Sequence, residues 1–362
     1  MTTRQRVRVP GWLAFTVAAL ALVLVPWPEA LVERLYSRGM FPVVQSVVTT
    51  LSNRTTVAII DVGLIAIAGW VIVRIVLAVR RRTSMGSWQA AWELLRRVIR
   101  VAAVMAVVFY LNWGLNYRRV SLQTLLQASA STADPAAPGA LLAAMEEAAR
   151  EASRLRAGGA GTDAARTGYT SIAAELEPAF QRALVRLDLP PLAQPGRPKV
   201  SWVLTPFYTA AGVTGMVNPV ALESIVHPDL LPFERPMVLA HEWAHLAGYA
   251  DEADASAIGW AACISGSSDL QYAAHMFLLL EGAGDLPRDQ WRRLRAGLHP
   301  GILEDFAALA QRLTRQEPVV REAAFTVYDQ YLKTNQVHDG VRSYGRAVRV
   351  LLMPQMRALA AQ

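Results

Sequence analysis

The sequence predicts a mainly α-helical chain, in which N-terminal transmembrane helices are followed by a mostly helical domain with a small β-sheet. Three observations support this fold class. Apolar residues make up 53% of the chain and charged residues only 18%, with a mean hydropathy of +0.24. The long apolar runs lie near the N-terminus. The remainder has the composition of an ordinary globular domain and shows mainly helical spacing of its apolar residues.

The same composition excludes several classes of protein. A disordered chain would not carry this much apolar surface. The single cysteine, Cys263, excludes an intrachain disulfide and a cysteine-based metal cage. The net charge is +7, but the arginine clusters flank apolar runs and are not interleaved with aromatic residues. We therefore expect no nucleic-acid partner.

The membrane anchor is predicted to occupy residues 1–117 and to contain three transmembrane helices, at about 11–28, 57–79 and 99–115. A bilayer core needs about 20 mostly apolar residues; the second run supplies them, and the first and third approach that length. The first run also resembles a signal peptide, but no clear small-x-small cleavage site follows it, so an uncleaved span is favoured. The lipid bilayer is thus an expected partner.

The orientation of the anchor follows from its arginines. The loop between the second and third spans, at 80–100, carries several arginines against one acid, Glu93. The positive-inside rule places the N-terminus and this loop in the cytoplasm. Residues 118–362 are then extracytoplasmic, with Arg118 and Arg119 on the side that the rule disfavours.

The extracytoplasmic part is predicted element by element from its spacing and its breaks. Residues 129–139 read as a linker, and helices are expected over 140–156 and 164–187. Residues 199–204 alternate as a strand does, and 212–218 form a second candidate strand or a loop. From Pro236 the pattern is helical to the end, with breaks at Gly248, 282–287 and 299–301.

One of these predicted helices carries a metal-binding motif. His241, Glu242 and His245 form H-E-x-x-H within an apolar stretch. Positions i and i+4 share one face of a helix, so both imidazoles can reach one metal ion. Glu242 lies where its carboxylate can act on a water molecule rather than bind the metal. Zn²⁺ is the expected cofactor, because it accepts imidazole nitrogens and needs no cysteine.

A catalytic zinc site needs a third protein ligand and an open position. Gly248 permits a turn, and three carboxylates follow it. Glu252 begins an E-x-x-A pattern at the head of the next helix, which is typical of gluzincins, and is the favoured ligand. Asp251 stands where metzincins place their third ligand, and Asp254 suits a supporting role beside a motif histidine.

Further catalytic groups are predicted less directly. A developing oxyanion needs a hydrogen-bond donor, which Tyr272, His275, Arg342 or Tyr344 could supply. Tyr344 is the preferred candidate. The segment 212–218 could offer an edge strand for an extended peptide.

Several stretches resemble a family of bacterial membrane-anchored proteins of unknown function that carry an H-E-x-x-H metallopeptidase motif. The matching stretches are NWGLNYRR (112–119), GVTGMVNP (212–219) with Glu223, HEWAHLAGYADEADA (241–255), LQYAAHMF (270–277) and YLKTNQVHDGVRSYGRAVRVLL (331–352). The resemblance implies a zincin-like domain on a multi-pass anchor in the bacterial inner membrane. It places the family's glutamate on Glu252 and its second acid on Asp254. Ser256 and Leu246 depart from the Asn and Gln of the family pattern.

The sequence therefore predicts a membrane-anchored, gluzincin-like zinc metallopeptidase that hydrolyses peptide or protein substrates. The alternative is a non-catalytic scaffold or binding protein, tethered to the membrane, whose metal site is structural or vestigial. The direction in which the carboxylates of Asp251, Glu252 and Asp254 point discriminates between these two hypotheses.

Overall fold

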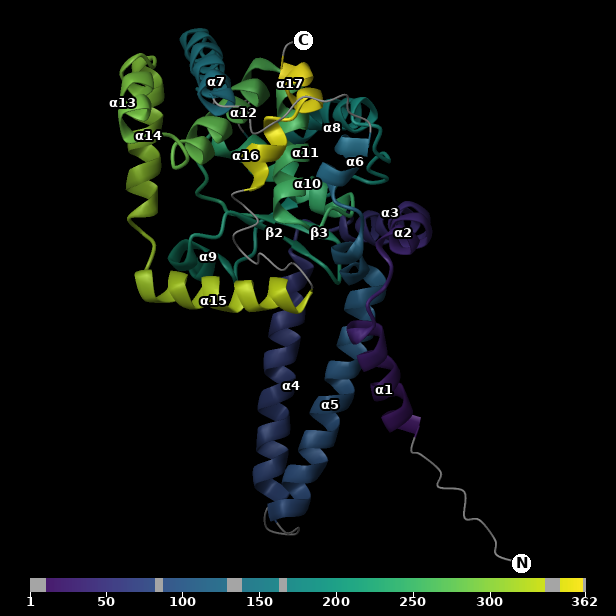
Figure 1. The fold of residues 1–362 in the computed structure, drawn as a ribbon. Coiled ribbons are helices and arrows are strands. Elements are labelled where there is room, and N and C mark those ends of the chain that lie inside the picture. Colours follow the sequence, from purple (N-terminus) through teal and green to yellow (C-terminus); the bar gives the residue numbers. More distant parts are fainter. Residues whose placement is uncertain (1–10, 82–86, 129–138, 163–167, 336–345, 361–362) are drawn as a thin grey trace, which may run out of the picture.

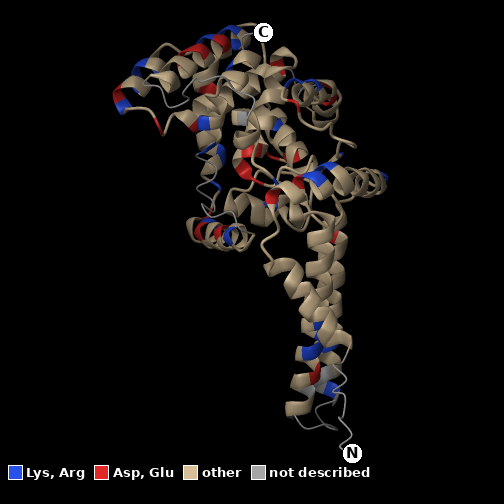
Figure 2. Cartoon of the chain, turned by 45° about the vertical axis from the view of Figure 1, so that its right-hand side comes forward, with Lys and Arg blue, Asp and Glu red and all other residues tan. Residues whose placement is uncertain are grey.

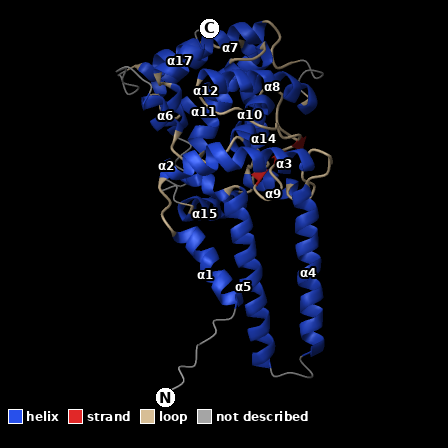
Figure 3. Ribbon diagram, turned by 90° about the vertical axis from the view of Figure 1, so that its right-hand side faces the viewer, coloured by secondary structure: helices blue, strands red, loops and turns tan. Residues whose placement is uncertain are grey.

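The computed structural model describes residues 11–81, 87–128, 139–162, 168–335 and 346–360, and it confirms a mostly helical chain with a small sheet (Figure 1). Two long helices, α4 (Ile59–Arg81) and α5 (Ser87–Asn112), extend together from one edge of a globular domain. Helix α1 (Gly11–Leu24) packs against α5. Figure 3 shows α4 and α5 extending from the domain in a second view, with the helices other than α1 gathered at one end of the pair.

One helix in the described part of the chain, α4, is long and apolar enough to cross a membrane by itself. Its apolar window runs from Ile59 to Leu77, and only 6% of that window is buried. Helix α1 is long and apolar enough to cross a membrane only if it is counted together with the segment Glu29–Ser52, and the chain bends by 104° between the two. Helix α5 does not pass alone. Its apolar run after Arg100 ends at Asn112, short of the predicted 115, because the next residues turn into the domain as a 3₁₀ helix, η2 (Gly114–Arg118).

The segment between α1 and α4 belongs to the globular part, although the predicted boundary at 117 assigns it to the anchor. It forms α2 (Glu29–Leu31), the π-helical η1 (Val32–Met40) and α3 (Phe41–Ser52). Glu33 makes a buried ion pair with Arg119 at 2.9 Å. Thr49 donates a hydrogen bond of 2.8 Å to the carbonyl of Leu222. The N-terminal residues therefore cover the domain as well as leading to the long helices.

A buried carboxylate joins α4 to the domain. Glu223 accepts hydrogen bonds from the first amides of α4, those of Ile59 at 3.0 Å and Ile60 at 2.8 Å. Its side chain and that of Lys199 are both fully buried and pair at 2.8 Å. A negative charge at a helix N-terminus is favourable, because the unpaired amides there carry partial positive charge.

The other acid at this junction is Asp61, which the sequence places near one end of the second apolar run. It accepts a hydrogen bond of 2.8 Å from the amide of Trp202 and another from the hydroxyl of Ser201. The charge of Asp61 thus lies against the domain, and the exposed apolar part of α4 begins after it.

The globular domain is built around one fully buried helix, α11 (Glu252–Ile264). Helices α10 (Glu234–Leu246), α8 (Tyr169–Arg186), α12 (Ser268–Gly282) and α16 (Arg346–Leu351) pack against it. The outer helices are α6 (Leu122–Ala128), α7 (Ala140–Ala157), α9 (Thr205–Ala211), α13 (Arg288–Ala296), α14 (Pro300–Leu313), α15 (Pro318–Thr334) and α17 (Pro354–Ala360). The predicted helices and the predicted breaks after Pro236 agree with these bounds, while residues 129–138 of the predicted linker lie outside the described residues.

The sheet has three short strands in the order β1-β3-β2. Strand β1 (Pro198–Lys199) is parallel to β3 (Glu223–Val226), and β2 (Gly215–Asn218) is antiparallel to β3. The predicted strand at 199–204 is wrong beyond Lys199, because the chain turns there and enters α9, whose first turn contains Pro206. Strand β3 was not predicted. It contains the buried Glu223, and its side chains are buried on both faces, so it shows no apolar–polar alternation.

Candidate metal centre

The H-E-x-x-H motif lies on α10, one of the most deeply packed helices. Leu239, Ala240, Trp243 and Ala244 are buried on the faces that point into the core. The helix ends at Leu246, and Gly248 then adopts a left-handed conformation with φ of +87°. A Cβ at Gly248 would lie 2.9 Å from the ring of Phe41. The turn after the motif therefore requires glycine for both conformation and space.

The following helix is placed so that its first residue faces the motif. Asp251 is the N-cap of α11, and its side chain accepts hydrogen bonds from the amides of Ala253 and Asp254 at 3.0 and 3.3 Å. Helices α10 and α11 approach closely, since a Cβ at Gly259 would lie 2.9 Å from the amide nitrogen of His241. This packing directs the Glu252 side chain toward both histidines.

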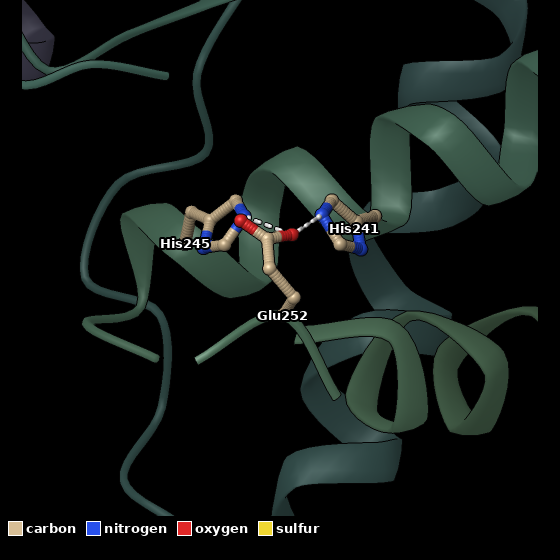
Figure 4. A group of neighbouring side chains, drawn as sticks. All are labelled: His241, His245 and Glu252. Carbon is tan, nitrogen blue, oxygen red and sulfur yellow. Dashed lines mark hydrogen bonds and ion pairs between the residues drawn. The ribbon is translucent and has the colours of Figure 1, made fainter. Parts of the chain in front are cut away.

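Three ligand atoms converge at this point (Figure 4). Oε2 of Glu252 lies 3.1 Å from Nε2 of His241 and 3.5 Å from Nε2 of His245. A tetrahedral site with metal–ligand bonds of about 2.0–2.1 Å has ligand–ligand separations of roughly 3.3–3.4 Å. Both spacings are close to that value, and all three ligand atoms lie within 4.8 Å of one another, so these three residues form a cluster that could hold a metal ion.

The three side chains are held by further hydrogen bonds. Nδ1 of His245 lies 2.7 Å from the carbonyl oxygen of Tyr249, and Nδ1 of His241 lies 3.2 Å from the hydroxyl of Ser256. Oε1 of Glu252 accepts a hydrogen bond from the hydroxyl of Tyr328 on α15. Each ligand therefore presents one atom to the centre and has its other polar atom engaged, as in metal sites generally.

Glu242 is buried beside this cluster and points toward strand β2. A Cβ on Gly215 would lie 2.5 Å from Oε1 of Glu242, so the missing side chain of Gly215 makes room for the carboxylate. Among the described residues, Oε2 of Glu242 has no hydrogen-bond partner. Burial raises the pKa of Glu242 to about 8. An unpartnered carboxylate in such a place is costly unless another group completes the site.

The charges of the cluster are strongly coupled. Burial opposes a positive charge on His245, but the Glu252 carboxylate outweighs burial and raises the pKa of His245 to about 9. Burial also opposes a charge on Glu252, yet the two histidines hold the pKa of its carboxyl well below the usual range. Burial lowers the pKa of His241. A negative charge on Glu252 and a neutral His241 are the protonation states that a cation requires of its ligands, and His245 would release its proton on binding one.

The stretch NWGLNYRR packs around the centre and fixes the turn after the motif. The indole of Trp113 donates a hydrogen bond of 3.2 Å to the carbonyl of His245. The guanidinium of Arg119 donates to the carbonyl of Gly248 at 3.0 Å and lies 3.8 Å above the ring of Tyr249. Pairing with Glu33 compensates the buried charge of Arg119. The contacts of Arg119 and Arg118 explain why these arginines lie on the side that the predicted topology disfavours. Arg119 binds the turn after the motif, and Arg118 donates a hydrogen bond to a backbone carbonyl of the N-terminal segment.

The other predicted site residues lie elsewhere or outside the described residues. Asp251 pairs with Arg346 and caps α11, and Asp254 accepts a hydrogen bond of 2.9 Å from the amide of Leu122. The side chain that lies beside a motif histidine, where Asp254 was expected, is that of Ser256. Tyr344, the preferred oxyanion donor, lies in 336–345, which the structure does not describe, as does Arg342.

Two further donor candidates, both on α12, lie beside other groups. Tyr272 donates its hydroxyl to Asp305 at 2.6 Å, and His275 is buried near acids of α7. The tyrosine beside the cluster is instead Tyr328, which was not predicted. Its place on the inner face of α15 follows from helical spacing, but no local pattern connects that helix with Glu252.

Comparison with protein families returns one match, to "Protein of unknown function (DUF3810)", over residues 36–352. The match covers most of the chain, from η1 to the end of α16, and the protein therefore belongs to this family. Comparisons with curated proteins and with solved structures return no match.

Proposed function

We propose that this member of the DUF3810 family is a membrane-anchored zinc metallopeptidase. The observation that carries the proposal is the convergence of His241, His245 and Glu252 beside a buried carboxylate, that of Glu242, whose Oε2 has no partner among the described residues. The donor set of two imidazoles and one carboxylate suits Zn²⁺ and leaves a fourth position open. A scaffold with a vestigial site is less well supported, because Glu252 faces both histidines.

The residues of the centre have distinct parts in peptide hydrolysis. His241, His245 and Glu252 would hold the ion, and zinc, when bound, would supply Lewis-acid chemistry that activates a water molecule and polarises a carbonyl. Glu242 accepts a proton from the attacking water while the water oxygen bonds to the carbonyl carbon of the peptide. It then passes that proton to the amine nitrogen as the carbon–nitrogen bond breaks.

Strand β2 supports a peptide as the substrate. It is an edge strand, and the amide of His227 bonds to the carbonyl of Thr214 at 2.9 Å, in register with the pairs Met216–Ile225 and Asn218–Glu223. In antiparallel pairing, alternate residues bond to the neighbouring strand. The backbone groups of the residues between, Gly215 and Val217, therefore point to the outer edge, where an extended polypeptide can pair beside Glu242.

The anchor is proposed to cross the membrane as three helices, with the globular domain outside the cytoplasm. Figure 2 shows the basic residues of α4 and α5 toward the end of the pair that is remote from the domain, and an uncharged stretch between. The arginines of that half include Arg74, Arg80, Arg96, Arg97 and Arg100. The positive-inside rule assigns that end to the cytoplasm. The low burial of α4 supports lipid contact rather than a place in a protein core.

Removal and return of zinc test this proposal. The full chain, purified in detergent and freed of metal by a chelator, is mixed with a peptide library, and the products are identified by mass spectrometry. The proposal predicts about one zinc per chain, cleavage that disappears with the metal, and cleavage that returns with added Zn²⁺. A chain that binds no zinc, or that cleaves equally without it, would contradict the proposal.

A further inference from the structure

The edge of the domain from which α4 and α5 extend exposes large apolar side chains. Trp202 is 77% exposed, Phe207 45% and Val203 44%, and all three lie in or just before α9. Val220, in the turn between β2 and β3, is 44% exposed. Figures 1 and 3 show α9 at this edge of the domain. We call these four residues the apolar base.

Hydrogen bonds fix the apolar base at the height where the long helices leave the domain. The amide of Trp202 donates to Asp61 in the first turn of α4. At the other helix, the side-chain amide of Asn112, the last residue of α5, donates to the carbonyls of Pro219 and Val220 at 2.6 and 3.1 Å. The base is therefore continuous with the exposed apolar surface of α4, and tryptophan is enriched at the height of the lipid headgroups.

Strand β2 connects this base with the metal centre. Its first residue, Gly215, lies against Glu242, and its last residue, Asn218, is followed by the Pro219–Val220 turn that α5 holds. A strand rises about 3.3 Å per residue, so the path from Gly215 to Asn218 is roughly 10 Å long. A polypeptide paired with the outer edge of β2 would thus run between the centre and the bilayer surface.

We propose that the apolar base rests in the headgroup layer of the bilayer, and that the metal centre takes polypeptide segments within a few residues of the membrane surface. The first part rests on the anchor and the second on the proposed peptidase activity. The substrate class is therefore the extracytoplasmic juxtamembrane segments of membrane proteins, or of polypeptides tethered to the membrane.

Spin labels test the seating of the domain independently of activity. Trp202→Cys and Phe207→Cys are labelled in the full chain, in nanodiscs of phosphatidylcholine and phosphatidylglycerol, with Val185→Cys on α8 as control because Val185 is also exposed, at 73%. The native Cys263 is buried and takes no label. We expect the ratio of oxygen to nickel-chelate collisions to be severalfold higher at 202 and 207 than at 185. Equal ratios at the three positions would overturn the proposal.

Tethered reporters test the substrate class. A peptide sequence that the wild-type protein cleaves is placed about 5 or about 25 residues from a single membrane span. At about 3.3 Å per residue, the shorter spacing extends to roughly 16 Å, close to the roughly 10 Å path along β2, and the longer one to roughly 80 Å. The near reporter is expected to be cleaved severalfold faster in proteoliposomes. Equal rates, or faster cleavage of the far reporter, would overturn the inferred substrate class without contradicting the proposed peptidase activity. If the protein cleaves no peptide at all, while the spin labels at 202 and 207 contact lipid, the proposed function is overturned. The proposal that the apolar base rests in the headgroup layer would then still hold.

Discussion

The hydroxyl of Tyr328 donates a hydrogen bond to Oε1 of Glu252, while Oε2 of the same carboxylate faces the two motif histidines. The two residues are far apart in the sequence, and α15 brings the tyrosine to the centre from the outside of the domain. By engaging one oxygen, Tyr328 orients the other toward the proposed metal position. This contact makes Tyr328 a positioning residue for Glu252, the proposed third ligand.

Tyr328→Phe is therefore expected to weaken zinc binding by roughly 10–100-fold, the usual cost of losing a hydrogen-bond partner of a metal ligand. Competition with a chromophoric chelator measures the affinity. Tyr331→Phe is the matched control, because Tyr331 stacks on Tyr328 but its hydroxyl accepts a hydrogen bond from Tyr117. Equal affinities of the wild type and Tyr328→Phe would show that the contact does not orient Glu252.

Gly215→Ala is expected to lower peptide cleavage by about 100-fold while zinc stays bound, since a displacement of about 1 Å in a catalytic group has effects of this size. The added Cβ would meet Oε1 of Glu242 and force the carboxylate to move. Gly284→Ala is the control, because nothing lies within 4 Å of a Cβ there. Steady-state cleavage and zinc content, measured on the same samples, check this prediction. Unchanged cleavage in Gly215→Ala would mean that Glu242 tolerates the shift.

Glu223→Gln is expected to destabilise the protein by about 3–5 kcal/mol, because it leaves Lys199 buried without a counter-charge. It also weakens the cap on the first turn of α4. The double variant Lys199→Met/Glu223→Gln should recover part of the loss, since no uncompensated buried charge then remains. Denaturant unfolding in detergent compares the three proteins. A double variant less stable than Glu223→Gln would contradict this account of the junction.

His275 makes stability depend on pH. Burial lowers the pKa of His275 to about 4 from its ordinary 6.5, although Glu151 and Glu147 oppose that shift. The unfolded chain therefore binds more protons than the folded chain between these values, and stability falls as the pH drops from 6.5 toward 4. At about 1.4 kcal/mol per pKa unit, the loss is about 3 kcal/mol.

Unfolding measured at pH 6.5 and pH 4.5 checks this effect of His275. The decrease in stability over that interval should be smaller in His275→Gln than in the wild type, because glutamine does not titrate. Equal decreases in the two proteins would assign the pH dependence to other groups.

The parts predicted from the sequence are those that depend on local pattern. H-E-x-x-H spacing requires only one helix, and the glutamate at 252 needs only a turn at Gly248, so both could be read from neighbouring residues. The helices after Pro236 follow from apolar periodicity and from breaks that contain glycine or proline. Helix α1 ends at Leu24, before the predicted limit of 28, because Pro26 and Pro28 follow it. Helix α5 ends at Asn112, before the predicted 115, because the Asn112 contact turns the chain there, although α5 begins earlier than predicted, at Ser87.

The parts that could not be predicted depend on contacts between distant segments. Glu223 pairs with Lys199 and with the start of α4, and Tyr328 reaches Glu252 from another helix; neither contact leaves a spacing in the sequence. The role of Ser256 was also missed, because a serine at that place departs from the asparagine of the family pattern. In the structure its hydroxyl lies beside His241.

The measurement that tests the central claim most directly compares wild-type protein with Glu242→Gln at equal zinc content. Glutamine keeps the size of the side chain but cannot take a proton from water. The account predicts about one zinc per chain in both proteins and peptide cleavage lower by about 10²–10⁴-fold in Glu242→Gln. Equal cleavage by the two proteins, with zinc bound in both, would contradict the assignment of this centre as a peptidase that uses Glu242 as its base.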